Sequence, residues 1–170
     1  MCSRLFKITV AFSCIIAAYM NASGQTVEVF PKITVNDDKL LFEIFVSSPS
    51  EEIVPVGNAV FEVSFNPEKL EFLGKDPELD GMWDDKSSSD YYDTFSTCIG
   101  NRAFFRILYK AGDETTVSEG VAVPTAEPAR VGCMAFQLKD QFAEGDIKWM
   151  QPFCIVSDIH ENKIAVILQQ

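Results

Sequence analysis

Several residue types and motifs that support catalysis are scarce or missing in this sequence. It contains one histidine, His160, and no HExxH, CxxC or glycine-rich phosphate-binding motif. A Cys–His or Ser–His pair needs an imidazole that a third group orients. His160 lies in a polar turn, SDIHEN, where acidic neighbours are usually solvated. We therefore predict that the protein is not an enzyme.

Basic residues are also few: 14 Lys and Arg stand against 25 Asp and Glu, which gives a formal net charge of −11. A surface of this sign repels nucleic acid and anionic lipid. It is compatible with neutral glycans, cations or a basic partner protein, and equally with a charge that serves solubility alone. The composition therefore excludes nucleic acid as the expected partner.

The chain lacks an apolar run of the length that a membrane span needs. The longest run, Ile8 to Met20, has thirteen residues, whereas a spanning helix needs about 20. It follows two basic residues and precedes a small, polar segment at 21–24, which is typical of a secretory signal peptide cleaved before Gln25. A lipoprotein signal that uses Cys14 is the alternative. We expect a signal peptide at 1–24 and one domain at 25–170, located outside the cell, on its surface or in a periplasm.

Cysteines are few once that segment is removed, and Cys98, Cys133 and Cys154 remain. Secretion permits one disulfide with one thiol left over. Spacing does not select the pair. A Cys98–Cys154 disulfide is favoured because Cys133 suits a small buried apolar position, and three free thiols are the alternative.

No segment has a sustained helical period, whereas short alternating segments bounded by turn residues recur. The clearest is Val60 to Gly74, VFEVSFNPEKLEFLG. Phe61, Val63 and Phe65 alternate with polar residues, which predicts a strand with one apolar face. Asn66-Pro67 then predicts a turn.

Other segments repeat this pattern. Gly100-Asn101 suits a tight hairpin turn between two alternating segments. Pro31 places the first strand at an edge or breaks it. Counting all such segments, we predict about nine strands in a single antiparallel β-sandwich. The further predicted strands are Val27–Val35, Lys39–Ser48, Tyr91–Ile99, Arg102–Lys110, Arg130–Leu138, Ile147–Met150, Phe153–Val156 and Ile164–Leu168.

The Val60–Gly74 segment resembles the early motif of cohesin-like domains, a family of secreted β-sandwiches. In that motif an alternating strand ends in an aromatic residue, followed by Asp/Asn-Pro, two polar residues and a Leu, which here are Phe65 to Leu70. RVGCMAFQL resembles a late strand of the family, and SDIHENKI resembles the polar turn before its last strand. The resemblance implies a non-catalytic recognition fold related to carbohydrate-binding modules, in which cohesins bind dockerins through one sheet face.

An acidic loop precedes the predicted hairpin. Calcium takes 6–8 oxygen ligands from carboxylates and carbonyls, so the closely spaced Asp80, Asp84 and Asp85 are candidate ligands for a Ca²⁺ ion. The Asn36–Asp38 cluster is a second candidate. Paired carboxylates could also hydrolyse a glycoside, but so many acids in one loop do not specify a pair. A solvated loop without metal is the alternative.

Trp83, Tyr91 and Tyr92 are the candidate ligand-binding residues. Flat exposed aromatic rings suit the apolar C–H face of sugars, and a Trp in a polar loop needs a reason to be there. The alternative is that Trp83 folds back and closes one end of the sandwich. Trp149 alternates with Ile147 and is expected in the core.

These observations predict a secreted, non-catalytic recognition module without a membrane span. The first hypothesis is that it binds a polysaccharide through the aromatic residues above. The second is that it binds a protein, as cohesins bind dockerins, or serves as an adhesion, assembly or spacer module of a cell-surface protein.

Overall fold

The computed structural model describes residues 24–50, 54–79, 81–83, 92–110, 121–125 and 127–169. These residues form twelve strands and two short 3₁₀ turns. None of the residues described forms a helix that is long and apolar enough to cross a bilayer. The strands are β1 (Thr26–Asn36), β2 (Lys39–Ser47), β3 (Val54–Val56), β4 (Asn58–Phe65), β5 (Leu70–Lys75), β6 (Tyr92–Ile99), β7 (Arg102–Tyr109), β8 (Val121–Val123), β9 (Ala129–Leu138), β10 (Ile147–Trp149), β11 (Ile155–Ser157) and β12 (Lys163–Leu168), and the turns are η1 (Glu144–Asp146) and η2 (Gln151–Phe153).

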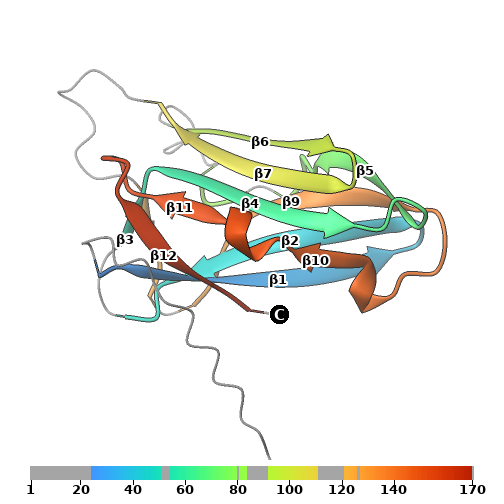
Figure 1. Cartoon of the computed structure of the whole chain (residues 1–170), viewed down its shortest axis with the longest axis horizontal. Coiled ribbons are helices and arrows are strands. Elements are labelled where there is room, and N and C mark those ends of the chain that lie inside the picture. The colour runs from blue at the N-terminus through green and yellow to red at the C-terminus, as the bar shows by residue number, and fades with distance from the viewer. Residues whose placement is uncertain are drawn as a thin grey trace, which may run out of the picture.

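The strands form two layers, which confirms the predicted β-sandwich (Figure 1). The back sheet has the order β5-β9-β2-β1. The front sheet has the order β11-β4-β7-β6, and β10 also pairs with β4. β12 runs parallel to β1 and antiparallel to β11, so it joins the two layers along one side. A separate ribbon of β3 and β8 lies outside both sheets.

The core lies between the layers, where the alternating side chains of β4 point inward. Phe61, Val63 and Phe65 are 1%, 0% and 6% exposed, as their alternation predicted. Phe65 packs edge-to-face on Phe136 of β9, with 5.3 Å between ring centroids. Aromatic pairs favour this geometry because the positive ring edge meets the negative ring face.

The turn after β4 forms as its sequence predicts. The Asn66 side chain accepts a hydrogen bond from the Glu68 backbone N–H at 3.1 Å, and its carbonyl accepts one from Leu70 N–H at 2.9 Å. An Asn side chain that bonds its own backbone two residues on closes a tight turn. The chain therefore reverses here and enters β5.

The Gly100-Asn101 hairpin is also confirmed. Ile99 pairs with Arg102 across the turn, and Gly100 has a φ of 63°. A residue with a Cβ rarely adopts such a value, whereas glycine does so without steric cost. The turn fixes the register of β6 against β7 and so decides which of their side chains point outward.

Pro31 marks an edge of the back sheet, as predicted. β12 pairs with β1 only from Thr26 to Val29, so the later part of β1 pairs with β2 alone. Proline lacks the N–H that a second ladder would need. A concavity of about 640 Å³ lies between this edge and β10, lined in part by Pro31, Phe42 and Trp149.

Strands β3 and β8 lie outside the predicted strands, because each has only three residues and β3 contains Pro55. The Tyr92 hydroxyl holds this ribbon in place. It donates to the Val56 carbonyl at 2.7 Å and accepts from the Val121 N–H at 2.8 Å. The ribbon therefore depends on a contact between distant parts of the chain.

Candidate functional site: the outer face of the front sheet

The front sheet exposes an unusual number of large apolar side chains on its outer side. Five of the eight large apolar residues that the described part of the chain exposes lie there: Ile99 (67%), Ile155 (48%), Phe153 (44%), Leu108 (41%) and Phe95 (36%). Monomeric proteins seldom leave a contiguous apolar patch uncovered, and such patches mark interaction sites. We call this surface the front face. It also includes Val60, Arg102, Phe104 and Arg106, which point to the same side.

Strand register brings these residues into rows. Phe95 on β6 lies opposite Arg106 on β7, Arg106 opposite Val60 on β4, and Val60 opposite Ile155 on β11. Directly opposite side chains on one face of a sheet are close enough to touch. One row of four side chains therefore crosses the whole front sheet.

Two arginines stack between three aromatic rings along this surface. The Arg106 guanidinium lies 5.9 Å from the Phe95 ring centroid and 5.6 Å from that of Phe104. The Arg102 guanidinium lies 5.5 Å from Phe104 and 4.8 Å from Phe153. Cation–π contacts operate within about 6 Å of the ring centroid. The stacks hold both guanidinium groups in fixed orientations.

Glu62 lies beneath this stack and is only 2% exposed, although it points to the outer side of β4. Its carboxylate accepts a hydrogen bond from Arg102 Nε. That bond raises the pKa of the Arg102 guanidinium. A buried carboxylate needs such a partner, so Arg102 is committed to Glu62 and contributes little free charge to the surface.

The charge of the front face opposes that of the whole chain. Arg102, Arg106 and Lys148 are cations on this side, and among the strand residues that the structure describes its carboxylates are Glu62 and Asp93. Glu62 is bound to Arg102, and Asp93 lies 3.0 Å from the Lys110 ammonium group. A molecule of net charge −11 therefore has a cationic, aromatic face.

The aromatic residues predicted to bind ligand lie elsewhere. Trp83 is 1% exposed and Tyr92 is 4% exposed, and their rings pack together 6.4 Å apart in the core. The expectation that these rings stand exposed is wrong, because Trp83 folds back onto the core and Tyr92 points inward from β6. Tyr91 lies outside the described residues. Trp149 packs edge-to-face on Phe42 at 5.0 Å, as expected for a core contact.

The candidate calcium ligands Asp80, Asp84 and Asp85 lie outside the described residues. Within the part of the chain that the structure describes, no group of three or more acidic, cysteine or histidine side chains is placed to hold a metal. Asp76, which begins the acidic loop, is 3% exposed and binds the Lys39 ammonium group at 2.6 Å. This hydrogen bond lowers the pKa of the Asp76 carboxyl despite its burial.

The favoured Cys98–Cys154 disulfide does not form, and all three described cysteines are free thiols. Cys98 on β6 lies opposite Ala103, which lies opposite Val63 on β4. Two strand spacings, about 9.5 Å, thus separate Cys98 from β4. Cys154 lies beyond that strand, where its sulfur accepts a hydrogen bond from the Glu62 N–H. A disulfide requires Cα atoms within about 7 Å.

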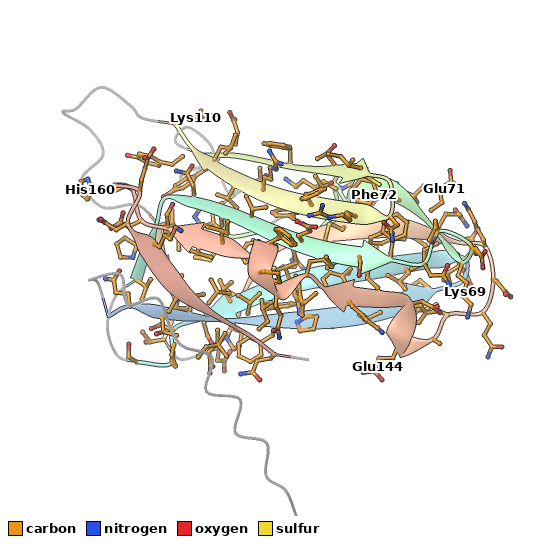
Figure 2. The ribbon with its side chains drawn as sticks, viewed as in Figure 1. Lys69, Glu71, Phe72, Lys110, Glu144 and His160 are labelled. Carbon is orange, nitrogen blue, oxygen red and sulfur yellow. The ribbon has the colours of Figure 1, made fainter. Side chains whose placement is uncertain are left out.

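His160 lies in an exposed turn at one end of the sandwich, opposite the end that holds Lys69 and Glu71 (Figure 2). Asp158 organises this turn, because its carboxylate accepts hydrogen bonds from the backbone N–H groups of His160 and Asn162, both at 2.8 Å. No side chain in the described ranges hydrogen-bonds to the His160 ring. The polar turn expected at SDIHENKI before the last strand is therefore confirmed.

The sequence analysis did not identify the front face, although β7 contains a signal for it. In RAFFRILY, Ala103, Phe105 and Ile107 form the buried register. Phe104 and Leu108 place apolar residues in the other register as well. A strand that is apolar on both faces is typical of a sheet that is covered on both sides.

The fold is that of a cohesin-like β-sandwich domain. A type II cohesin domain from the cellulosome of Acetivibrio cellulolyticus superposes with a TM-score of 0.57 at 10% identity, covering 85% of this chain and 92% of that one. The sixth cohesin of scaffoldin B from the same organism, solved in complex with a Cel5 dockerin, gives a TM-score of 0.52 at 12% identity over 86% and 95% of the two chains.

A type I cohesin, the seventh of ScaB from Pseudobacteroides cellulosolvens, gives a TM-score of 0.54 at 12% identity over 84% of this chain and 87% of that one. No protein-family model matches the sequence, and no curated protein matches it. At these identities the resemblance establishes the fold.

Proposed function

We propose that this protein is a non-catalytic recognition module that binds another protein through the front face. The observation that carries the proposal is the concentration of exposed apolar residues, with Ile99 at 67% and Ile155 at 48%, on one side of one sheet. Protein interfaces are enriched in aromatic residues and arginine at their centres. The alternating stack of Phe95, Arg106, Phe104, Arg102 and Phe153 has this composition.

The structural neighbours support a protein partner over a polysaccharide. One of the matching cohesins was solved in complex with a dockerin, so the fold supports protein recognition in a relative. Glycan binding through Trp83 and Tyr92 lacks support, because both rings are buried. We further propose that residues 1–24 direct secretion and that residues 25–170 act outside the cell.

The proposal is tested by capture followed by titration of an identified partner. The immobilised protein is exposed to the secreted proteins of the culture that produces it, and a retained protein is identified, purified and titrated by calorimetry. Ile99→Asp places a charge on the most exposed apolar residue of the front face, at the end of β6, and should weaken binding at least about tenfold. Val35→Asp is the matched control, because Val35 is 46% exposed but lies on β1 of the back sheet.

A panel of insoluble polysaccharides is run in parallel. We expect no retention of the protein on any of them. The proposal would be refuted if the protein is retained on a polysaccharide, the Ile99→Asp variant is retained equally well, and no partner protein is captured. Thermal melts of both variants establish that altered binding does not come from unfolding.

A further inference from the structure

Arg106 is the least satisfied charged group of the front face. Its Nε is buried and has no hydrogen-bond partner. Arg106 forms no ion pair with any residue that the structure describes. Arg102 lies two positions away on the same face of β7, with Phe104 between them, and binds the Glu62 carboxylate through its own Nε. Both arginines stack on two aromatic rings, but among the residues that the structure describes only Arg102 has an anion.

A buried donor without an acceptor costs free energy in the unbound protein. Phe95 and Phe104 hold the Arg106 guanidinium in place from two sides. An arginine whose planar group is already oriented loses little entropy when it binds a carboxylate through two parallel hydrogen bonds. Arg106 is therefore a preformed receptor for a carboxylate.

The surroundings of Arg106 restrict what can carry that carboxylate. Val60 and Ile155 continue its row across the sheet, and Phe95 precedes it. A ligand on this row must bury apolar surface on both sides of the anion. The net charge of −11 repels a strongly acidic molecule at long range. A single carboxylate among apolar groups satisfies both conditions.

We propose that the partner places an Asp or Glu side chain, flanked by apolar side chains, on Arg106. This inference rests on the proposed protein-binding function and specifies the chemistry of the partner at that same surface. The row Phe95–Arg106–Val60–Ile155 then receives one acidic residue between two apolar ones. Arg102 stays bound to Glu62 and shapes the neighbouring surface.

The probe is a library of random displayed peptides, selected on the wild-type protein and counter-selected on Ile99→Asp. We expect the recovered peptides to contain an Asp or Glu beside apolar residues. For one such synthetic peptide, Arg106→Gln should weaken binding roughly 10- to 100-fold, the usual range for a charge-assisted hydrogen bond. Arg106→Lys should restore part of that loss, because it keeps the charge without the planar donor pair.

Two controls make the test specific. Lys139→Gln removes a cation that lies 3.3 Å from Glu71, after the end of β9, and should change affinity less than about threefold. Replacing the peptide carboxylate with its amide should cost as much as Arg106→Gln, and the two changes together should cost little more than either alone.

The outcomes separate this inference from the proposed function. The inference is overturned if the peptides that lose affinity for Ile99→Asp lack an acidic residue. It is also overturned if those peptides bind Arg106→Gln as well as they bind wild type. Either result leaves the protein-binding function standing. A library that yields no peptide sensitive to Ile99→Asp would overturn both. Circular dichroism of the Arg106 variants confirms that they fold.

Discussion

Replacing Phe65 with alanine tests the central packing contact of the sandwich. Phe65 ends β4 and is 6% exposed. Its ring packs on Phe136 at 5.3 Å, and Phe136 packs in turn on Phe72 at 5.4 Å. The three rings come from β4, β9 and β5, so they connect the front and back sheets. Phe65→Ala removes the front-sheet member of this cluster.

The expected loss is about 3–5 kcal/mol in the free energy of unfolding, the usual range for a buried Phe that becomes Ala. Part of it is the transfer of the ring out of the core, and part is the cavity that remains. The edge-to-face contact with Phe136 adds about 0.5–1.5 kcal/mol beyond the area buried. Because Phe136 is fully buried and held by Phe72, the site has little room to collapse.

The assay is urea unfolding followed by circular dichroism, with the midpoint and the slope both determined. Leu73→Ala is the control, because Leu73 is 53% exposed and should cost less than about 0.5 kcal/mol. A loss below about 1 kcal/mol for Phe65→Ala, at an unchanged slope, would show that this ring does not connect the two sheets as described.

Three further predictions concern charge, thiols and metal. The hydrogen bond from Lys39 lowers the pKa of the Asp76 carboxyl below 3.8, so the ionised carboxylate stabilises the fold above that pH and ceases to do so as the pH falls through the folded-state pKa. The stability difference between wild type and Asp76→Asn should therefore shrink below about pH 4. A difference that stays constant with pH would contradict this assignment. Burial raises the pKa of Cys133 to about 12 and that of Cys154 to about 11. Iodoacetamide at pH 8 should therefore label Cys98 before the other two thiols, which peptide mass mapping would show. Equal labelling of all three cysteines in the native protein would argue against this packing. The protein should fold without metal, so a chelator should leave the thermal melt unchanged, and a fall of tens of degrees would point to a structural calcium site.

Local sequence patterns predicted those parts of the fold that depend on near neighbours. The alternation around Phe65 predicted which side chains of β4 enter the core, because successive residues of a strand point to opposite faces. Gly100 and Asn66 predicted their turns, because each turn is closed by its own backbone and side-chain atoms. Pro31 predicted an edge, because it lacks a donor for a second ladder.

Features that depend on distant segments could not be predicted in this way. Strands β3 and β8 are three residues each and pair only with each other, so neither has a local signal. Trp83 lies in a polar segment, and only the packing of Tyr92 shows that it belongs to the core. The separation of Cys98 from Cys154 follows from the order of β6, β7 and β4, which spacing along the chain does not contain.

By itself the sequence determined a β-sandwich with an alternating core, an acidic composition and a resemblance to cohesins, because periodicity and turn residues act over a few neighbours. Only the tertiary structure decided which outer surface exposes apolar side chains. Strand order and register bring Phe95, Arg106, Val60 and Ile155 from four strands into one row. The same packing buries Glu62 against Arg102 and leaves Arg106 without an anion among the residues that the structure describes. This row depends on the assembled sheet, because no single strand contains it.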